Sequence, residues 1–74
     1  MNIFVVDKDS KKFLCNIDFI PNKDDRIILK NTEWSNKEYV VQCVVYEPNE
    51  HAVFIFVVEV EPYYFKMISE IKWR

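Results

Sequence analysis

The stretch that decides the fold runs from residue 38 to residue 61 and reads EYVVQCVVYEPNEHAVFIFVVEVE. Two long apolar runs flank a polar turn at Pro48 and Asn49. Along each run, successive side chains alternate between two faces, as they do in a β-strand. Proline favours the first central position of a turn, and asparagine suits the second. The stretch therefore predicts two long strands, at residues 38–47 and 51–61, joined as a hairpin.

Shorter strands precede this hairpin. Residues 2–6 form an apolar run that ends in a polar turn, residues 13–20 alternate apolar and polar side chains, and residues 26–30 follow a turn that begins at Pro21. Ten valines and eight isoleucines stand against one alanine. Because branched side chains fit a pleated surface better than a helical turn, the composition also favours strands.

The segment after Pro62 is ambiguous. Tyr64, Ile68 and Ile71 have helical spacing, whereas residues 65–73 also alternate at strand spacing. We expect a short helical turn at residues 62–65, followed by a strand.

A chain of 74 residues has room for one hydrophobic core, so we expect residues 1–74 to form a single small β domain. The expected fold class is all-β, with one short C-terminal helix as an option. The expected architecture is a five- to six-stranded antiparallel barrel or bent sheet. A core this small gives marginal stability unless something supplements it.

Residues 19–29 read FIPNKDDRIIL, and residues 39–46 read YVVQCVVY. This order resembles the opening of many small Src-homology-3-like barrels, with Asp24 and Asp25 in place of the usual glycine-aspartate pair. The resemblance covers roughly residues 19–60. It implies a binding module, because such barrels present loops and one sheet face to peptides, nucleic acid or other proteins.

The composition argues against an enzyme. The chain has no glycine, which excludes glycine-rich phosphate loops. Its one histidine, His51, and two cysteines do not have zinc-site spacing. The carboxylate pairs at residues 24–25 and 59–61 lack a further ligand group, and a solvated rim is the more frequent role of such pairs. We therefore expect no catalytic residue, no metal and no cofactor.

The N-terminus has neither a signal peptide nor a spanning segment, so we expect a cytoplasmic protein, in the host cytoplasm if a phage encodes it, with no membrane contact. In that compartment Cys15 and Cys43 are expected to be buried and reduced, with a disulfide as the alternative. The net charge of −2 disfavours duplex nucleic acid as a partner.

Residues 52–58 read AVFIFVV and are apolar on both faces. One small domain has one interior, so the outer face of this strand needs a cover. The cover is either the C-terminal segment or a partner, and a partner would form a homodimer or a hetero-complex through this strand or through residues 39–46.

Aromatic side chains are the candidate partner-binding residues, although most rings in so small a domain are needed for the core. Trp34 lies in a polar loop and is the least suited to the core. The candidates are Trp34, Tyr39, Tyr46, Phe54, Phe56, Tyr63, Tyr64 and Trp73.

The leading hypothesis is a non-enzymatic protein-interaction module. Residues with AT-rich codons (Phe, Tyr, Met, Ile, Asn and Lys) number 34, against 6 for Gly, Ala, Arg and Pro. This bias indicates an AT-rich genome and suggests a phage or mobile-element inhibitor of a host or defence protein. The alternative is a small nucleic-acid or nucleotide-binding barrel in which Trp34, Tyr39, Lys37 and Lys30 stack on bases and contact phosphates.

Overall fold

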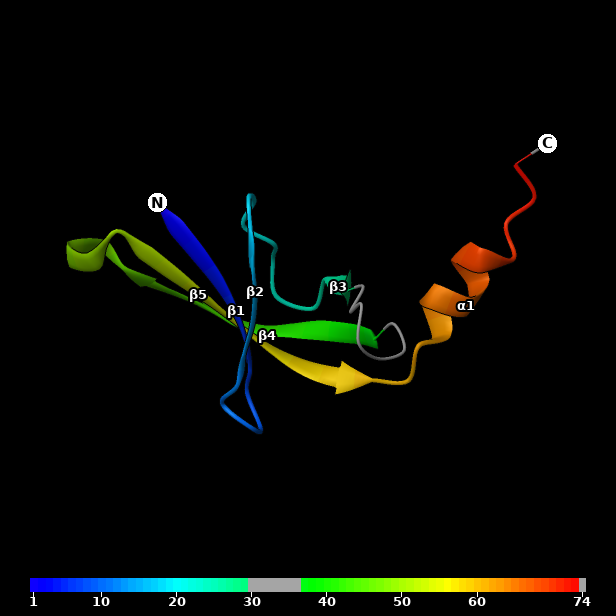
Figure 1. Ribbon diagram of the computed structural model, residues 1–74, viewed down its shortest axis with the longest axis horizontal. Helices are drawn as coiled ribbons and strands as arrows, with labels where there is room; N and C mark the ends of the chain where they lie inside the picture. Colours follow the sequence, from blue (N-terminus) through cyan, green and yellow to red (C-terminus); the bar gives the residue numbers. More distant parts are fainter. Residues whose placement is uncertain (30–36, 74) are drawn as a thin grey trace.

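The computed structural model of the chain describes residues 1–29 and 37–73. Within them, five strands precede one short helix (Figure 1). The elements in chain order are β1 (Asn2–Asp7), β2 (Phe13–Ile17), β3 (Arg26–Leu29), β4 (Lys37–Glu47), the 3-10 turn η1 (Pro48–Glu50), β5 (Ala52–Val60) and α1 (Tyr63–Ser69).

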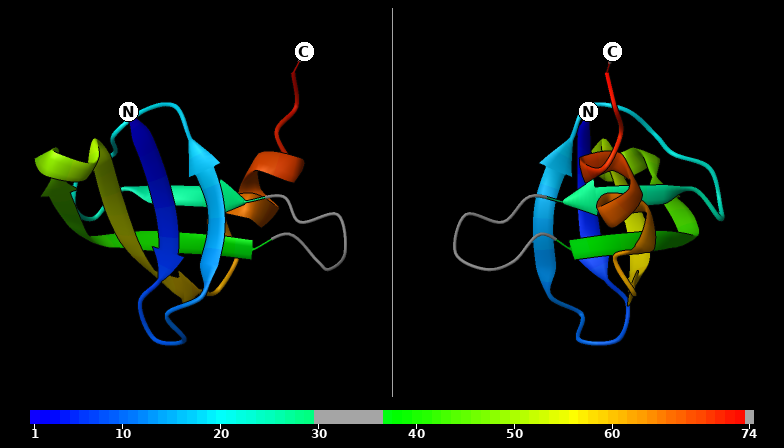
Figure 2. Two further views of the ribbon diagram at one scale, coloured as in Figure 1. Left: turned by 60° about the vertical axis from the view of Figure 1, so that its left-hand side comes forward. Right: turned by 90° about the vertical axis from the view of Figure 1, so that its right-hand side faces the viewer.

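The strands form one sheet in the order β2-β1-β5-β4-β3. Figure 2 shows the sheet curling into a half-barrel, with β1 and β2 crossing in front of β3 and β4. This architecture confirms the expected small all-β fold with a short C-terminal helix and is consistent with an Src-homology-3-like fold. The molecule is elongated, at 47 × 27 × 22 Å, because α1 projects beyond one end of the sheet (Figure 1).

The core lies on the concave side of the curl, which we call the inner face. Alternate residues of β1, β4 and β5 point there, and the most deeply buried are Val5, Val41, Val53, Ile55 and Val57, all with no exposed surface. β-branched side chains at every second position therefore build the core, as the alternation predicts.

Strand β4 contains an irregularity that exchanges its faces. The pairing with β5 shifts between Val41 and Cys43, so that Gln42 is the extra residue of a β-bulge. As a result Tyr39 and Val41 point into the core before the bulge, and Val44 does so after it. The bulge also meets the turn before β3, because the Val41 N–H donates to the Asp25 carbonyl at 2.8 Å.

The observed elements differ from the predicted ones in two places. The strand expected after residue 65 is wrong: α1 continues to Ser69, and residues 70–73 are not strand. The expectation of antiparallel pairing is incomplete, because β1 pairs with β5 in parallel. β1 and β5 are far apart in the sequence, so no tight turn joins them, and a tight turn is what requires neighbouring strands to be antiparallel.

Candidate functional site

The convex side of the sheet, which we call the outer face, carries a row of phenylalanines. Phe4 of β1 lies beside Phe54 of β5 in the parallel register, and their rings stack with centroids 5.4 Å apart. Phe56 stacks on Phe54 at 6.5 Å, and Phe13 of β2 meets Phe4 edge to face at 6.0 Å. Such pairs prefer these offset and edge-on geometries. Three adjacent strands thus build one aromatic surface.

Strand β4 extends this surface. Cys43 pairs with Phe56, and Val45 pairs with Phe54, so both lie on the outer face after the bulge. Val45 is 42% exposed and Phe13 is 54% exposed, while the stacked rings are half-buried. We call this surface the outer strip, which comprises Phe4, Val6, Phe13, Cys43, Val45, Phe54 and Phe56.

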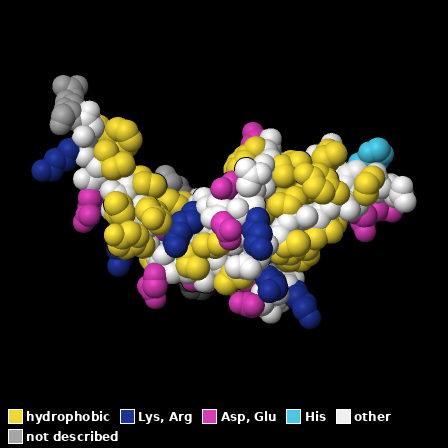
Figure 3. Space-filling model, turned by 180° about the vertical axis from the view of Figure 1, so that it is seen from behind, with side chains coloured by type: hydrophobic (Ala, Val, Ile, Leu, Met, Phe, Trp, Pro, Cys, Tyr) yellow, Lys and Arg dark blue, Asp and Glu magenta, His cyan; other side chains and the backbone are white. Residues whose placement is uncertain are grey.

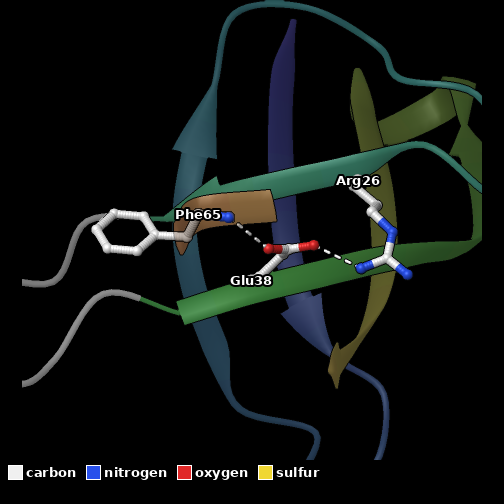
Figure 4. Close-up of polar contacts among 3 residues, drawn as sticks. All are labelled: Arg26, Glu38 and Phe65. Carbon is white, nitrogen blue, oxygen red and sulfur yellow. Dashed lines mark hydrogen bonds and ion pairs between the residues drawn. The ribbon is translucent and has the colours of Figure 1, made fainter. Parts of the chain in front are cut away.

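At the other end of the same face, a buried carboxylate holds α1. Glu38 of β4 has no exposed surface. One carboxylate oxygen accepts a hydrogen bond from the Arg26 guanidinium of β3 at 2.5 Å, and the other accepts from the Phe65 N–H of α1 at 2.9 Å (Figure 4). The Arg26 guanidinium also lies over the Tyr64 ring, 4.8 Å from its centroid.

Glu38 acts as the missing cap of α1. The first N–H groups of a helix have no partner within the helix, and a side chain usually accepts from them. The residue before α1 is Pro62, whose side chain has no oxygen to offer. Glu38 supplies that oxygen from a strand, and its negative charge also suits the positive end of the helix.

The surroundings of Glu38 keep its carboxylate charged. Burial by itself raises the pKa of the carboxyl group. The hydrogen bonds from the Phe65 N–H and from Arg26, the charge of Arg26 and the Tyr64 N–H together outweigh burial and hold that pKa below its usual range. The charged Glu38 side chain is therefore buried inside the fold, where it holds α1 in position.

Beyond this anchor, α1 and the residues after it leave most of their apolar surface in solvent. Every residue of α1 is exposed or half-buried. We call residues 63–73 the C-terminal arm; its exposed apolar side chains are Tyr63, Tyr64, Met67, Ile68, Ile71 and Trp73. Figure 3 shows hydrophobic side chains gathered over α1 and again over the half of the molecule that carries His51, with charged side chains between the two areas.

The structure divides the predicted partner-binding residues among several places. Phe54 and Phe56 belong to the outer strip. The C-terminal arm contains Tyr63, Tyr64 and Trp73; the two tyrosine rings meet edge to face at 5.2 Å, and Trp73 is 81% exposed. Tyr46 is 58% exposed but neighbours Val45 along β4 and therefore points to the opposite face of the sheet.

Two further candidates are not part of either surface. Tyr39 is only 5% exposed and packs in the core, where burial, followed by the charges of Glu59, Asp7 and Cys15, raises its pKa. Its ring therefore has little surface to offer a partner. Trp34 lies outside the described residues.

The two cysteines lie on opposite faces of the sheet and are both free. Cys15 packs against the core, and burial raises the pKa of its thiol. Cys43 is exposed on the outer strip, which corrects the expectation that both thiols are buried. A disulfide between them is not present, because the sheet separates the two side chains.

An open groove lies between the two edge strands. Its volume is about 440 Å³. It is lined by Ile17 of β2, by Phe19 and Pro21 of the connection between β2 and β3, and by Ile27 and Leu29 of β3. No cluster of three or more histidine, cysteine or acidic side chains within residues 1–29 and 37–73 is placed to bind a metal ion.

Several residues of the outer face were not among the predicted partner-binding residues. Glu38 and Arg26 carried no recognised motif, although a glutamate at the head of a strand apolar on both sides was a usable signal. Phe4, Phe13 and Val45 were assigned to strands, but only the parallel pairing of β1 with β5 places Phe4 beside Phe54.

Comparisons with known proteins do not assign this chain to a family. No protein-family model, curated protein or solved structure matches it. In the part of the chain that the structure describes, no helix is long and apolar enough to cross a membrane.

Proposed function

We propose that this chain is a protein-interaction module that binds its partner through the outer strip and the C-terminal arm. The observation that carries the proposal is the exposed apolar side chains at both ends of one sheet face, from Phe13 and Val45 to Ile68 and Trp73. Large exposed apolar patches on soluble proteins mark interaction sites. Aromatic residues also dominate the binding energy of protein interfaces.

The overall dimensions support the same proposal. A compact monomer of 9.0 kDa exposes roughly 4,900 Å² of surface, whereas this chain exposes 5922 Å², about 1,000 Å² more. Its radius of gyration is 13.4 Å, where a compact domain of 74 residues has about 11 Å. A partner on the outer face would cover surface that a lone domain would normally bury.

Two considerations refine the proposal. The nucleic-acid alternative relied on Trp34, Tyr39, Lys37 and Lys30, of which Trp34 and Lys30 lie outside the described residues. The Tyr39 ring lies in the core, and the Lys37 ammonium pairs with Glu59 at 3.4 Å. This arrangement favours a protein partner. The composition typical of AT-rich genomes supports one finer version, an inhibitor from a phage or mobile element that occupies a surface on a host protein.

The proposal is tested by capturing partners with an N-terminally tagged chain in its source cells and identifying stoichiometric proteins by mass spectrometry. Untagged copies of the chain itself count as a partner. We expect capture by the wild type to be lost in Val45→Glu on the outer strip and in Ile68→Lys on the C-terminal arm, because each places a charge in an apolar interface.

Tyr46→Glu is the matched control, since Tyr46 is adjacent to Val45, is similarly exposed and points to the other face. It should capture the same partner as the wild type. Capture that survives Val45→Glu and Ile68→Lys would contradict the proposal. Salt-dependent binding of the wild type to single-stranded oligonucleotides, measured by fluorescence anisotropy, would favour the nucleic-acid alternative instead.

A further inference from the structure

We infer that the partner is a second copy of this chain, and that the C-terminal arm of each copy packs on the outer strip of the other. This inference rests on the proposed function, because it names the occupant of the same two surfaces. The resulting dimer has two-fold symmetry, and each copy contributes both an arm and a strip.

The positions of the arm and the strip allow this reciprocal packing. Glu38, which holds α1, and Val45, which belongs to the outer strip, lie on the same face of β4. The arm and the hairpin that carries the strip lie at opposite ends of the long axis of the molecule (Figure 1). A two-fold axis that lies in the interface plane, parallel to this face and perpendicular to the long axis, exchanges the two ends, so the arm of one copy meets the strip of the other. Two-fold interfaces are self-complementary in this way.

The C-terminal arm is fixed at its first turn, but its apolar side chains pack against little of the chain itself. A helix of seven residues is too short to be stable by itself in water. Glu38 and Arg26 hold its first turn, while Met67, Ile68 and Ile71 remain 44–48% exposed. The anchor therefore sets the direction of the arm and leaves its apolar side chains free to pack against another surface.

The exposed surface of the chain is large enough for an interface. A stable interface of standard size buries about 800 Å² on each partner. The chain exposes about 1,000 Å² more than a compact monomer of its mass. The reciprocal contact uses both the arm and the strip on each copy, and the extra surface of the chain is of the size that a stable interface needs.

The charges near the two surfaces are complementary. The end of the β4–β5 hairpin, next to the strip, carries Glu47 and Glu50, and the arm carries Lys66 and Lys72 with one acidic residue, Glu70. Figure 3 shows acidic side chains beside the histidine at the hairpin end. The two-fold arrangement brings the basic arm of one copy towards the acidic hairpin of the other. An arm-to-arm or strip-to-strip dimer would instead bring like charges together.

The decisive experiment measures mass by size-exclusion chromatography with light scattering at high micromolar concentration. The wild type should have twice the chain mass of 9.0 kDa. Val45→Glu and Ile68→Lys should each weaken dimerisation by about 10-fold or more, because each buries an unpaired charge. Tyr46→Glu should remain a dimer. Circular dichroism checks that each variant is folded, which we expect because the substituted side chains are exposed.

Mixing the two monomeric variants separates this arrangement from other dimers. In the mixed dimer, one arm and one strip of wild-type sequence meet, and the other contact pairs Lys at position 68 with Glu at position 45. Mixing should therefore restore the dimer mass. If the wild type is a dimer but the mixture of the two variants keeps the monomer mass, the arm-on-strip arrangement is overturned.

A second measurement does not depend on variants. Cys43 is an exposed thiol within the outer strip, so its alkylation rate in the wild type should fall as the protein concentration rises through the dimerisation range. A constant rate, together with a strict monomer mass, would overturn the inference. If the chain is a monomer but captures a different protein through the same surface, the inference fails and the proposed function stands.

Discussion

Within residues 1–29 and 37–73, three non-glycine residues have a left-handed backbone, since the chain has no glycine to occupy such positions. Lys11 has φ of 61°, Asp24 of 74° and His51 of 52°. Glycine adopts this region without steric cost, aspartate tolerates it, and lysine has no such advantage. At Asp24 a residue that tolerates positive φ therefore makes the turn without glycine. Each of these turns thus retains backbone strain that the rest of the fold must outweigh.

Replacing Lys11 with glycine should therefore stabilise the protein. Relief of the left-handed strain exceeds the extra backbone entropy of glycine in the unfolded chain, and we expect a gain of about 0.5–1 kcal/mol. Urea denaturation measures the change as a higher midpoint. Lys12→Gly is the control, because Lys12 is not among the positive-φ residues, and it should lower the midpoint. Equal shifts in both variants would argue against strain at Lys11.

A second residue-scale prediction concerns the core. Ile55 has no exposed surface and lies in the central strand β5, so Ile55→Val should destabilise the protein by about 1 kcal/mol. In a domain of this size the melting temperature should fall by about 4–8 °C. Ile20→Val, at a position that is 39% exposed, should change stability by less than about 0.5 kcal/mol. Similar losses in the two variants would contradict the assignment of the core.

At the scale of elements, α1 depends on a strand for its cap. The sequence supplies no capping side chain before Tyr63, and all of the arm's apolar residues remain exposed or half-buried. Glu38 and Arg26 therefore contribute to the position of α1 more than its own residues do. The expected C-terminal strand was wrong for the same reason: the capping partner of α1 lies 27 residues away in the sequence.

Removing the charge of Glu38 should release α1 while the sheet persists. In Glu38→Gln the amide lacks the charge that Arg26 and the helix N-terminus favour. Hydrogen exchange at the Phe65 amide, which donates to Glu38, should become much faster, while the amides of β5 keep most of their protection. Glu59→Gln is the control, since it removes only an exposed ion pair, and should leave Phe65 unchanged.

The same contact should respond to acid. The pKa of Glu38 is lower in the folded protein than in the unfolded chain, so its contribution to stability is complete above the unfolded pKa and is lost as the pH falls through the folded pKa. Exchange at Phe65, corrected for the intrinsic effect of pH, should accelerate across that acidic window. Protection of Phe65 that is unchanged throughout the window would show that the Glu38 charge does not hold α1.

At the scale of the whole molecule, the curled sheet leaves more apolar surface than one core absorbs. The inner face buries Val5, Val41 and Ile55 completely, yet the outer face still exposes Val45 and Phe13. A sheet of five strands that curls only half-way around cannot cover both of its own faces. The remaining surface is therefore available to a partner.

Self-association should make the melting temperature depend on protein concentration. If unfolding also dissociates a dimer, a hundred-fold rise in concentration stabilises the folded state by mass action, and the melting temperature should rise by about 5–10 °C. Differential scanning fluorimetry or circular dichroism measures the shift. Val45→Glu should abolish the dependence, whereas Tyr46→Glu should retain it. A melting temperature that is independent of concentration in the wild type would contradict dimerisation.

Local pattern was sufficient to predict much of this fold. Side-chain alternation predicted the strands at the positions of β2, β4 and β5, and short apolar runs beside polar turns predicted those at the positions of β1 and β3. It also showed that residues 52–58 are apolar on both faces, which raised the question of a cover for the outer face. The strand positions and the apolar character of each face depend on neighbouring residues alone, so they can be predicted without the tertiary structure.

Only the tertiary structure decided which distant residues meet. The parallel pairing of β1 with β5 builds the outer strip by placing Phe4 on Phe54, and the bulge at Gln42 turns Cys43 and Val45 to the same face. The burial of Glu38 beneath α1 likewise depends on contacts between separate elements. Hydrophobic periodicity records which side of a strand is apolar, but register and strand order depend on the packing of the whole chain.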